Sequence, residues 1–250
     1  MAEKRANFIL NYIRQKEEVT LRELCMLFPD YNEMTIRRDL NLLVKNGYIT
    51  RTHGGARLNH DNIGESHFYH MRENAMTLEK NIIAQKASQI ISGSTIYLDS
   101  STTILTFAKT IPDKQLFIVT NSPLITLEMQ NKKNIEVLLT GGSLNKKMLS
   151  VSGPVALNAL SQLNIDMAFM SASGMSINHG FTNGVHAECE VKRAAINNAK
   201  KICMMIDSSK YERILPYTFC TWDKIDYLIT DKELPESYNE VISKNKITVL

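Results

Sequence analysis

The sequence predicts an α/β domain with a mostly parallel sheet, preceded by a small α+β unit. Before residue 59, three short amphipathic stretches with helical spacing are followed by a hairpin pattern, which predicts the small unit. From Met76 onward, short apolar runs rich in β-branched residues alternate with helical stretches. These runs are continuously apolar, as in strands buried on both faces of a parallel sheet, so they predict the large α/β domain.

The composition is that of an ordinary globular protein. Of the 250 residues, 44% are apolar and 22% are charged, which excludes a disordered or fibrous chain. No apolar run approaches the ~20 residues that a membrane span needs, and the start MAEKRANFIL lacks the apolar region of a signal peptide. The cysteines show no CxxC spacing, and Cys203 lies in the apolar run ICMMI. We expect a reduced, cytoplasmic protein without a structural metal, a cofactor or a membrane partner.

The positive charge is confined to the first quarter of the chain. The formal net charge is +3, and residues 1–58 hold 10 Lys and Arg against 7 Asp and Glu, whereas residues 59–250 hold 19 of each. Three excess charges on a small domain are common by themselves. Their location in one unit nevertheless favours a nucleic-acid contact there.

Two helices are expected at the start of the small unit. The first covers residues 3–16, where apolar side chains share one face at helical spacing, namely Phe8, Ile9, Tyr12 and Ile13. The second begins at TLRE, where Thr20 and Glu23 form a capping box, and it ends before Pro29.

The third helix and the hairpin complete the small unit. Asn32 is expected to cap a helix that runs to about residue 45 and stops at Gly47. Its inward stripe is formed by Ile36, Leu40 and Leu43, which leaves outside, near the amino end, Thr35, Arg37 and Arg38. The stretch YITRTHGGARL then alternates like a strand, with Gly54 and Gly55 as the expected turn. Three helices and a basic hairpin are the outline of a winged helix-turn-helix.

We therefore divide the chain into three segments. Residues 1–58 are the predicted winged helix-turn-helix domain, and the polar residues 59–75 are the predicted linker. Residues 76–250 are the predicted α/β domain, whose expected strands are STIYLD, LFIVT, IEVLLT, IDMAFM, ICMMID, DYLIT and ITVL.

Five of these strands are followed by small polar residues. After the first strand, hydroxyl and amide groups open a helix, which favours an anion such as phosphate, although the same residues can also serve simply as helix caps. Glycines after the third strand permit close approach of a ligand. Because an α/β domain builds its site at the strand ends, the five loops together predict one polar pocket for a small hydroxylated anion. Their polar residues are Asp99, Ser100, Ser101, Thr102, Thr103, Thr120, Asn121, Ser122, Gly141, Gly142, Ser173, Gly174, Asp207, Ser208, Ser209 and Lys210.

Several motifs resemble one known family. The stretch TIRRDLNLLVKNGYITRTHGGA closely resembles the N-terminal signature of the DeoR family of bacterial transcriptional repressors. LDSSTT, VTNS, TGG, SASG, ECEVKRA and DSSK then follow in the order of that family's effector domain, so the match spans nearly the whole chain. The resemblance implies that the second domain has a fold like that of ribose-5-phosphate isomerases and CoA-transferases. It also implies that this domain senses a phosphorylated sugar or a related metabolite.

The resemblance implies roles for single residues. It makes the loop from Asp99 to Thr103 a phosphate cradle, Asn121 a ligand of hydroxyl groups, and Glu188 and Lys210 polar walls of the pocket. From the residues alone, Glu188 can instead be a solvated carboxylate at a helix start, and Lys210 can be a surface lysine.

Two serines depart from the family pattern. Ser101 and Ser171 stand where many members have glycine, which narrows the pocket and leaves the identity of the effector open. His179 and His186 are expected in loops, with no nucleophile paired to either.

The arginine pair of the third helix is predicted to meet DNA. Such a pair on an exposed helix is commonly a solvated face, but here it lies beside a basic wing in the part of the chain that holds the positive excess. The arginine fork suits O6 and N7 of guanine, and wing side chains suit phosphates or the minor groove. Asp39 is expected to orient an arginine. The predicted DNA-binding residues are Thr20, Asn32, Thr35, Arg37, Arg38, Arg51, His53 and Arg57.

The predicted function is that of a DNA-binding transcriptional regulator, a repressor of carbohydrate metabolism genes controlled by a phosphorylated sugar. One winged helix makes few contacts with DNA, so we expect a homo-oligomer, a dimer or tetramer, that reads paired half-sites. We expect contacts in the second domain to join its subunits. The first alternative is a sugar-phosphate isomerase or transferase, which needs a base beside a carbonyl, yet the stretch SASGMSINHG holds no Asp or Glu. The second alternative is an adaptor whose winged helix binds protein, which the arginine pair disfavours.

Overall fold

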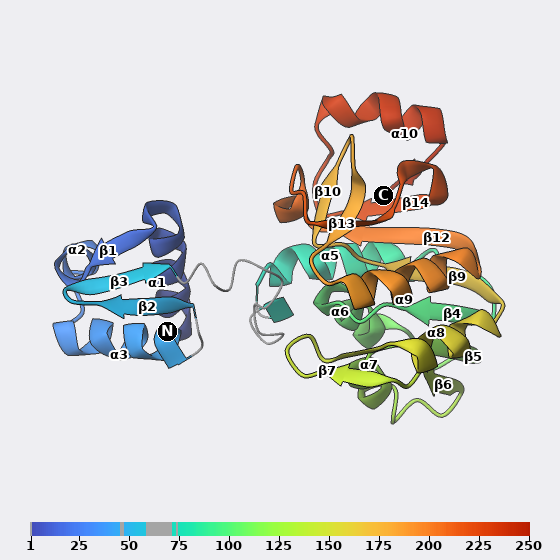
Figure 1. Ribbon diagram of the computed structural model, residues 1–250, viewed down its shortest axis with the longest axis horizontal. Coiled ribbons are helices and arrows are strands. Elements are labelled where there is room, and N and C mark those ends of the chain that lie inside the picture. The colour runs from blue at the N-terminus through green and yellow to red at the C-terminus, as the bar shows by residue number, and fades with distance from the viewer. Residues whose placement is uncertain (1, 46–47, 59–71, 74) are drawn as a thin grey trace. The chain divides into compact units, whose positions relative to one another are not determined.

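The computed structural model describes residues 2–45, 48–58, 72–73 and 75–250 (Figure 1). The chain folds as two compact units, Met1–Phe68 and Tyr69–Leu250. The boundary falls inside the predicted linker, residues 59–75, while the finer limits at 58 and 76 stay a prediction. Gly47 and nearly all of the linker lie outside the described residues.

The N-terminal unit combines three helices with a small antiparallel sheet. Its elements are α1 (Ala2–Lys16), β1 (Glu18–Thr20), α2 (Leu21–Leu27), α3 (Glu33–Lys45), β2 (Ile49–Thr52) and β3 (Gly55–Leu58). The three predicted helices and the hairpin are confirmed. β1 was not predicted, because three residues between two helices carry no periodicity. It pairs with β3 on the side opposite β2, so β3 is the central strand.

The expected caps hold the helices of this unit. Thr20 and Glu23 form the capping box at the start of α2, and the Oδ1 of Asn32 accepts from the amide of Thr35 at 2.9 Å. The inward stripe of α3 is fully buried, as are Ile9 and Ile13 of α1. The assignment of Phe8 to the inner face is wrong. Its side chain is 57% exposed and packs edge-on against Phe28, with ring centroids 5.5 Å apart.

The turn of the wing lies one residue earlier in the chain than expected. Thr52 pairs with Gly55, so the turn consists of His53 and Gly54, and Gly55 is the first residue of β3. A Cβ on Gly55 would lie 1.9 Å from the carbonyl oxygen of Val19 in β1, whereas a Cβ on Gly54 would meet nothing within 4 Å. Gly55 is therefore required by the close approach of β1 and β3.

The C-terminal unit alternates strands and helices as predicted. Its elements up to the fourth sheet strand are α5 (Thr77–Ser88), β4 (Thr95–Leu98), α6 (Thr102–Thr110), β5 (Leu116–Thr120), α7 (Pro123–Glu128), β6 (Ile135–Leu139), β7 (Ser143–Asn145), β8 (Ser150–Ser152), α8 (Pro154–Ser161) and β9 (Ile165–Met170). The remaining elements are β10 (Gly174–Ser176), β11 (Gly180–Asn183), α9 (His186–Asn197), β12 (Ala199–Ile206), η2 (Ser208–Lys210), β13 (Tyr217–Cys220), η3 (Trp222–Lys224), β14 (Tyr227–Thr230), η4 (Glu236–Tyr238), α10 (Asn239–Asn245) and β15 (Thr248–Val249). No helix of the described residues is long and apolar enough to cross a membrane.

One parallel sheet contains all seven strands that the sequence predicts. Their order is β15-β14-β12-β9-β4-β5-β6, and every pairing is parallel. Alternate residues of each strand enter two cores. Tyr97 packs with α8 and α9 on one face, and Ile96 and Leu98 pack with α5, α6 and α7 on the other (Figure 1). Burial on both faces is the physical reason for the continuous apolar runs.

Short strands that were not predicted lie beyond the ends of this sheet. β7 and β8 form an antiparallel pair, and β10, β11 and β13 form a second antiparallel sheet. They contribute Ser150 at the start of β8 and Asn183 at the end of β11, both of which reach the site described below.

Gly55→Ala tests the wing geometry. The added methyl group collides with the Val19 carbonyl, so we expect a loss of about 1–3 kcal/mol in the stability of the N-terminal unit. Amide hydrogen exchange of β1 and β3 in the full chain measures this loss. Gly54→Ala is the matched control and should exchange like the wild type, because its methyl group has open space. Equal exchange in both variants would contradict the packing argument.

Candidate functional site

The amino end of α3 presents a polar, basic surface. Ile36 and Leu40 are fully buried, so the opposite face of the helix points to solvent. Arg37 and Arg38 are exposed there and Thr35 is half-buried. The exposed side chains and the helix orientation are those that the sequence predicts.

The two arginines differ in what they contact. Arg37 donates from Nε to Oε1 of Glu33 at 2.7 Å, an exposed i,i+4 ion pair. Such pairs contribute little, ~0.3–0.5 kcal/mol, so Arg37 is easily redirected to another anion. Arg38 has no side-chain partner among the residues that the structure describes. Arg38 is thus the better placed of the two to contact an external group.

Thr20 and Asn32 are occupied as caps. The Thr20 hydroxyl accepts from the amide of Glu23 at 3.2 Å and donates to its carboxylate at 2.8 Å. The Asn32 carbonyl accepts from both the amide and the hydroxyl of Thr35, at 2.9 and 2.8 Å. These contacts fix the helix ends. A contact of either residue with DNA stays a prediction.

The wing residues are exposed to different degrees. His53 in the turn and Arg57 on β3 are exposed, whereas Arg51 on β2 is half-buried. The Nη1 atom of Arg51 is buried without a hydrogen-bond partner among the described residues. Of the two wing arginines, Arg57 is therefore the more accessible to a phosphate.

A buried ion pair fixes the orientation of α3. Asp39 is 5% exposed and accepts from Nε of Arg5 in α1 at 2.5 Å. The guanidinium group of Arg5 also lies 4.1 Å from the ring centroid of Tyr31. Hydrogen bonding to Asp39 raises the pKa of Arg5. The expectation that Asp39 orients an arginine is confirmed, and that arginine belongs to α1.

In the C-terminal unit, the five predicted loops follow five neighbouring strands at one edge of the sheet. Those strands are β12, β9, β4, β5 and β6. The chain passes from β4 to β5 on one side of β4 and later returns to β9 on the other side of β4. The order in which the strands are added to the sheet therefore reverses beside β4. Ligands of open α/β sheets bind outside the carboxyl ends of the strands at such a point.

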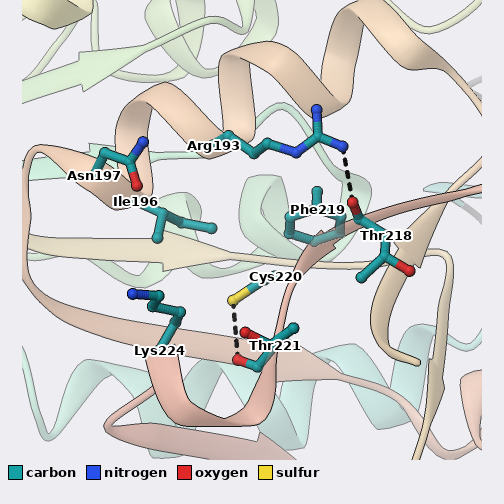
Figure 2. A pocket seen from close by; sticks show the side chains of 8 residues that line it. All are labelled: Arg193, Ile196, Asn197, Thr218, Phe219, Cys220, Thr221 and Lys224. Atoms are coloured by element: carbon teal, nitrogen blue, oxygen red, sulfur yellow. Dashed lines mark hydrogen bonds between the residues drawn. The ribbon is translucent and has the colours of Figure 1, made fainter. Parts of the chain in front are cut away.

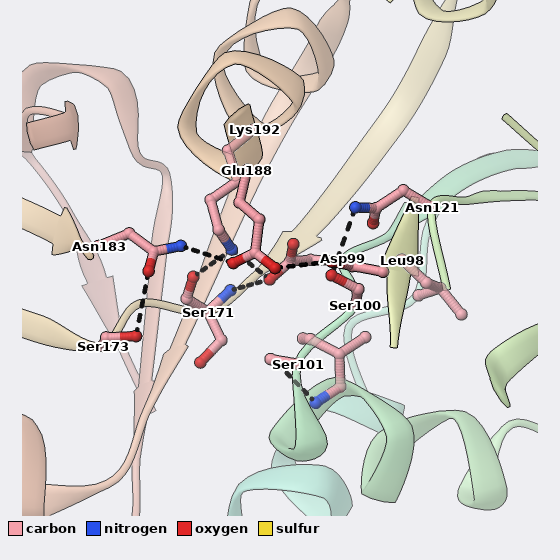
Figure 3. Close-up of polar contacts among 12 residues, drawn as sticks. Leu98, Asp99, Ser100, Ser101, Asn121, Ser171, Ser173, Asn183, Glu188 and Lys192 are labelled. Atoms are coloured by element: carbon pink, nitrogen blue, oxygen red, sulfur yellow. Dashed lines mark hydrogen bonds and ion pairs between the residues drawn. The ribbon is translucent and has the colours of Figure 1, made fainter. Parts of the chain in front are cut away.

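The centre of this site is an ion pair between β4 and α9 (Figure 3). Asp99 is fully buried, and its Oδ2 accepts from Nζ of Lys192 at 2.5 Å and from the amide of Ser171 at 3.3 Å. Lys192 also donates to the carbonyl oxygen of Ser171 at 2.9 Å. The other carboxylate oxygen of Asp99, Oδ1, is buried without a hydrogen-bond partner in the described part of the chain. That oxygen can accept from a ligand.

A second carboxylate lies beside the ion pair. Glu188 is 6% exposed, with Oε1 accepting from the Ser150 hydroxyl at 2.6 Å and Oε2 accepting from the Asn183 amide at 3.2 Å (Figure 3). The Ser173 hydroxyl donates to Oδ1 of the Asn183 side chain at 3.4 Å. Glu188 is therefore a buried member of the site, and its alternative assignment as a solvated helix-start carboxylate is wrong.

Asn121 is held in place from several sides. Its amide donates to the Ser100 hydroxyl and to the carbonyl oxygen of Val151, both at 3.3 Å, and its Oδ1 accepts from the Tyr97 hydroxyl at 2.9 Å. Burial raises the pKa of Tyr97 well above its ordinary value, and the charges of Asp99 and Glu188 raise it further, so the phenol stays protonated. This arrangement orients Asn121 firmly. Its contact with a ligand hydroxyl stays a prediction.

The remaining predicted residues of these loops have clear structural roles. Ser101 caps α6 through the amide of Ile104, and Ser122 caps α7 through the amide of Ile125. Thr102 and Thr103 are buried in the first turn of α6. Gly142 has φ +113°, and a Cβ there would lie 2.3 Å from the carbonyl oxygen of Ser152. Gly141 precedes it with φ +73°, and Gly174 opens β10.

Lys210 lies at the end of η2, after β12, and is half-buried. It is close enough to Lys80 of α5 to lower the pKa of that lysine. The structure thus places Lys210 on the α5 side of the strand ends, whereas Glu188 and Lys192 lie on the α9 side. The expectation that His186 lies in a loop is wrong, because it is the first residue of α9 and pairs with Glu190 at 3.8 Å.

The sequence analysis did not identify three residues of the site as candidates, namely Lys192, Ser150 and Asn183. It named Ser171, but not as a contact of Asp99. Lys192 had a usable signal, because it lies one helical turn after Glu188 within ECEVKRA and so shares its face of α9. Ser150 and Asn183 lie on short strands without a pattern.

A separate shallow pocket of about 210 Å³ lies beside α9 and β13 (Figure 2). Arg193 and Lys224 flank it, and Arg193 donates to the carbonyl oxygen of Thr218 at 2.8 Å. None of its residues was predicted to bind a ligand. Groups of His, Cys, Asp or Glu suited to a metal ion are absent from the described residues.

Family models match both units. A model described as DeoR-like helix-turn-helix domain matches residues 5–62, and one described as DeoR C terminal sensor domain matches residues 75–232. The chain belongs to the DeoR family of transcriptional regulators. It is a DNA-binding regulator with a sensor domain, and the alternative of an isomerase or transferase is wrong.

Relatives agree with this assignment. The uncharacterized HTH-type transcriptional regulator YulB of Bacillus subtilis is 32% identical over 98% of this chain and 95% of its own. The glycerol-3-phosphate regulon repressor of Escherichia coli is 30% identical over 98% of this chain and 96% of its own. Ribose 5-phosphate isomerase A of Methanocaldococcus jannaschii aligns over 53% of both chains, with 16% identity and a TM-score of 0.38. At that level nothing about function follows.

Lys192→Met tests the central ion pair. Removal of the ammonium group leaves Asp99 buried and uncompensated, so we expect the C-terminal unit to lose about 3–5 kcal/mol of stability. Adding Asp99→Asn to the same chain should recover much of that loss. Urea unfolding of the full chain measures both.

Lys200→Met is the matched control, because Lys200 pairs with Asp166 at 2.8 Å but is largely exposed. It should cost less than about 1 kcal/mol. Equal losses for Lys192→Met and Lys200→Met would show that burial of the pair has no energetic consequence.

Proposed function

We propose that this regulator is a repressor of carbohydrate metabolism genes whose sensor domain binds a phosphorylated sugar at the strand ends. The observation that supports this most directly is the buried Oδ1 atom of Asp99, which lacks a hydrogen-bond partner among the described residues. A buried carboxylate oxygen left in this state costs free energy unless a donor reaches it. A sugar hydroxyl is such a donor, and Glu188 and Asn121 stand beside it.

The phosphate group fits the amino end of α6. The first amides of a helix, here those of Thr102 and Thr103, have no acceptor within the helix. The helix dipole adds a partial positive charge at the same place. Lys210 supplies a full charge from the neighbouring side. The ligand is thus proposed to extend from Asp99 and Glu188 at its hydroxyl end toward α6 at its phosphate end.

The name of one relative points to the same chemistry. The glycerol-3-phosphate regulon repressor is named for a phosphorylated polyol and for repression. We carry both features to this chain as part of the proposal. The segment limits 1–58, 59–75 and 76–250 belong to it as well.

On the DNA side, we propose that Arg38 and Thr35 read bases from α3, with Arg37 released from Glu33 to join them. Arg57 and His53 contact phosphates from the wing. Thr20, Asn32 and Arg51 contribute to the same DNA-binding surface. Thr20 and Asn32 do so by capping the helices that they precede.

Tight binding to an operator requires more than one such unit, so we propose a homo-oligomer, a dimer or tetramer, joined through the sensor domain. Leu78 and Ile82 support this, because they lie one turn apart on α5 and are 76% and 42% exposed. Exposed apolar side chains at this spacing form a face that a second subunit can cover.

Arg38→Ala tests the reading helix. A bidentate contact with guanine is worth ~1–3 kcal/mol, and each half-site loses it, so we expect specific operator binding to fall at least tenfold while the fold stays intact. Fluorescence anisotropy with operator and scrambled DNA at one salt concentration gives the specificity ratio.

Arg57→Ala is the matched control. It should weaken binding to both DNAs by a similar factor and reduce the slope of log affinity against log salt by about 0.9 per site, as expected for a phosphate contact. If Arg38→Ala kept the wild-type specificity ratio, α3 would not read bases through this residue.

Thr103→Val tests the phosphate end of the pocket. The change keeps the shape of a buried side chain but removes its hydroxyl, and a hydrogen bond to a charged group is worth ~1.5–3 kcal/mol. We expect the thermal stabilisation by a phosphorylated sugar to fall sharply while DNA binding is unchanged. The measurement is a melting screen over sugar phosphates and the matching free sugars.

Thr106→Val, one turn later in α6, is the control, because its hydroxyl donates only to the carbonyl oxygen of Thr102 at 3.0 Å. It should respond like the wild type. Stabilisation by free sugars equal to that by their phosphates would remove the phosphate from the proposal.

A further inference from the structure

Two residues that precede α5 are held against three parts of the sensor domain. The ammonium group of Lys80 in α5 donates to the carbonyl oxygens of Arg72 and, at 3.5 Å, of Glu73. The Glu73 carboxylate pairs with Lys109 of α6 at 3.7 Å. Nη2 of Arg72 donates to the sulfur of Met148 at 3.5 Å. Arg72 and Glu73 therefore bridge α5, α6 and the turn between β7 and β8.

The turn that Arg72 contacts belongs to the effector site. Met148 is 3% exposed and lies two residues before Ser150, whose hydroxyl donates to Glu188 at 2.6 Å. The amide of the next residue, Val151, donates to the carbonyl oxygen of Asn121 at 2.8 Å. Arg72 is thus connected, through the short turn between β7 and β8, to two residues of the proposed ligand pocket, Glu188 and Asn121.

Positive charge exceeds negative charge around Lys80 on this side of the strand ends, with Lys80, Lys210 and Arg72 against Asp207 and Glu73. Lys80 is only 3% exposed, and burial lowers its pKa to about 8. Asp207 and Glu73 oppose that shift, whereas Lys210 and Arg72 add to it, so the charges of all four residues act on Lys80. On the α9 side, by contrast, the buried carboxylates of Asp99 and Glu188 lie beside the ammonium group of Lys192. An anionic group of a ligand is therefore favoured on the side of Arg72.

We infer that Arg72 binds the anionic group of the effector, so that ligand binding holds the chain at residues 72–73 against the sensor domain. This inference rests on the proposed function of the same site. A thioether sulfur is a weak acceptor, and a phosphate oxygen would replace it with a much stronger, charge-assisted partner. The planar guanidinium fork can also engage two phosphate oxygens at once.

The position of Arg72 in the chain gives this contact a consequence for regulation. The chain runs from the DNA-binding unit into the sensor domain through the segment that ends at Arg72. A ligand with a higher affinity for the protein when Arg72 is in one position shifts the population of protein conformations toward that position. The effector then acts on the connection between the two units through a residue that it touches.

Arg72→Gln in the full chain tests the inference. Melting and titration are carried out with inorganic phosphate, with glycerol 3-phosphate and with the sugar phosphate that stabilises the wild type most. We expect the affinity of Arg72→Gln for the phosphorylated compounds to fall about tenfold or more. The weaker affinity for the free sugar should stay as in the wild type. The response of operator affinity to the ligand should be lost.

Arg193→Gln is the matched control, because Arg193 lies on α9 beside the separate pocket of Figure 2 and should bind phosphorylated compounds like the wild type. Arg72→Lys keeps the charge without the fork, and we expect it to lose about threefold to tenfold in affinity. If Arg72→Gln does not melt cooperatively, the affinity of Arg72→Lys tests the role of Arg72 instead.

The possible outcomes separate the two proposals. If Arg72→Gln binds the phosphorylated compounds with wild-type affinity, the role of Arg72 is overturned and the proposed function still stands. The same holds for Arg72→Lys where it replaces Arg72→Gln in the test. A wild-type protein that no phosphorylated compound stabilises overturns the proposed function, and the inference falls with it.

Discussion

The buried ion pair between Asp99 and Lys192 is the interaction on which the sensor domain depends. It joins the end of β4, from which the sheet extends in both directions, to α9, and it includes Ser171 at the end of β9. A buried ion pair is costly to form, because both groups lose their hydration. The pair leaves one oxygen of Asp99 buried without a hydrogen-bond partner in the described part of the chain, and it holds α9, the helix that carries Glu188. Under the proposed function, stability and ligand recognition depend on the same two side chains.

Most of the fold could be predicted because its signals are local. Continuous apolar runs identified all seven strands of the parallel sheet, and capping patterns identified α2 and α3. β1, β7 and β10 could not be found in this way, since three residues carry no readable period. The turn of the wing was placed one residue too far along, because only the approach of β1 to Gly55 decides which glycine starts β3.

The site was predicted as a location more fully than as a set of contacts. Parallel strands place their carboxyl ends at one edge, so loops that are distant in sequence could be assigned to one pocket. The partners of Glu188 could not be assigned, because Ser150 and Asn183 are 38 and 5 residues away and lie on strands that the sequence does not reveal. Lys192 was named within a motif but not recognised as the counterion of Asp99, a pairing across 93 residues that only the fold creates.

Under the proposed function, the distribution of charge at the strand ends explains how one pocket can recognise a ligand with two unlike ends. A pocket made only of Asp99, Glu188 and Lys192 would repel a phosphate, since it holds two carboxylates and one ammonium group. In the proposed orientation the phosphate lies at the other side, where the amino end of α6, Lys210 and Arg72 carry positive charge. Hydroxyl groups are then directed toward the carboxylates, which are acceptors. A ligand with hydroxyls at one end and a phosphate at the other fits in a single orientation, and reversing it brings phosphate against carboxylate. Because the proposed phosphate side includes Arg72, near the start of the sensor domain, the proposed recognition of the ligand's orientation and the proposed transmission toward the DNA-binding unit require the same groups.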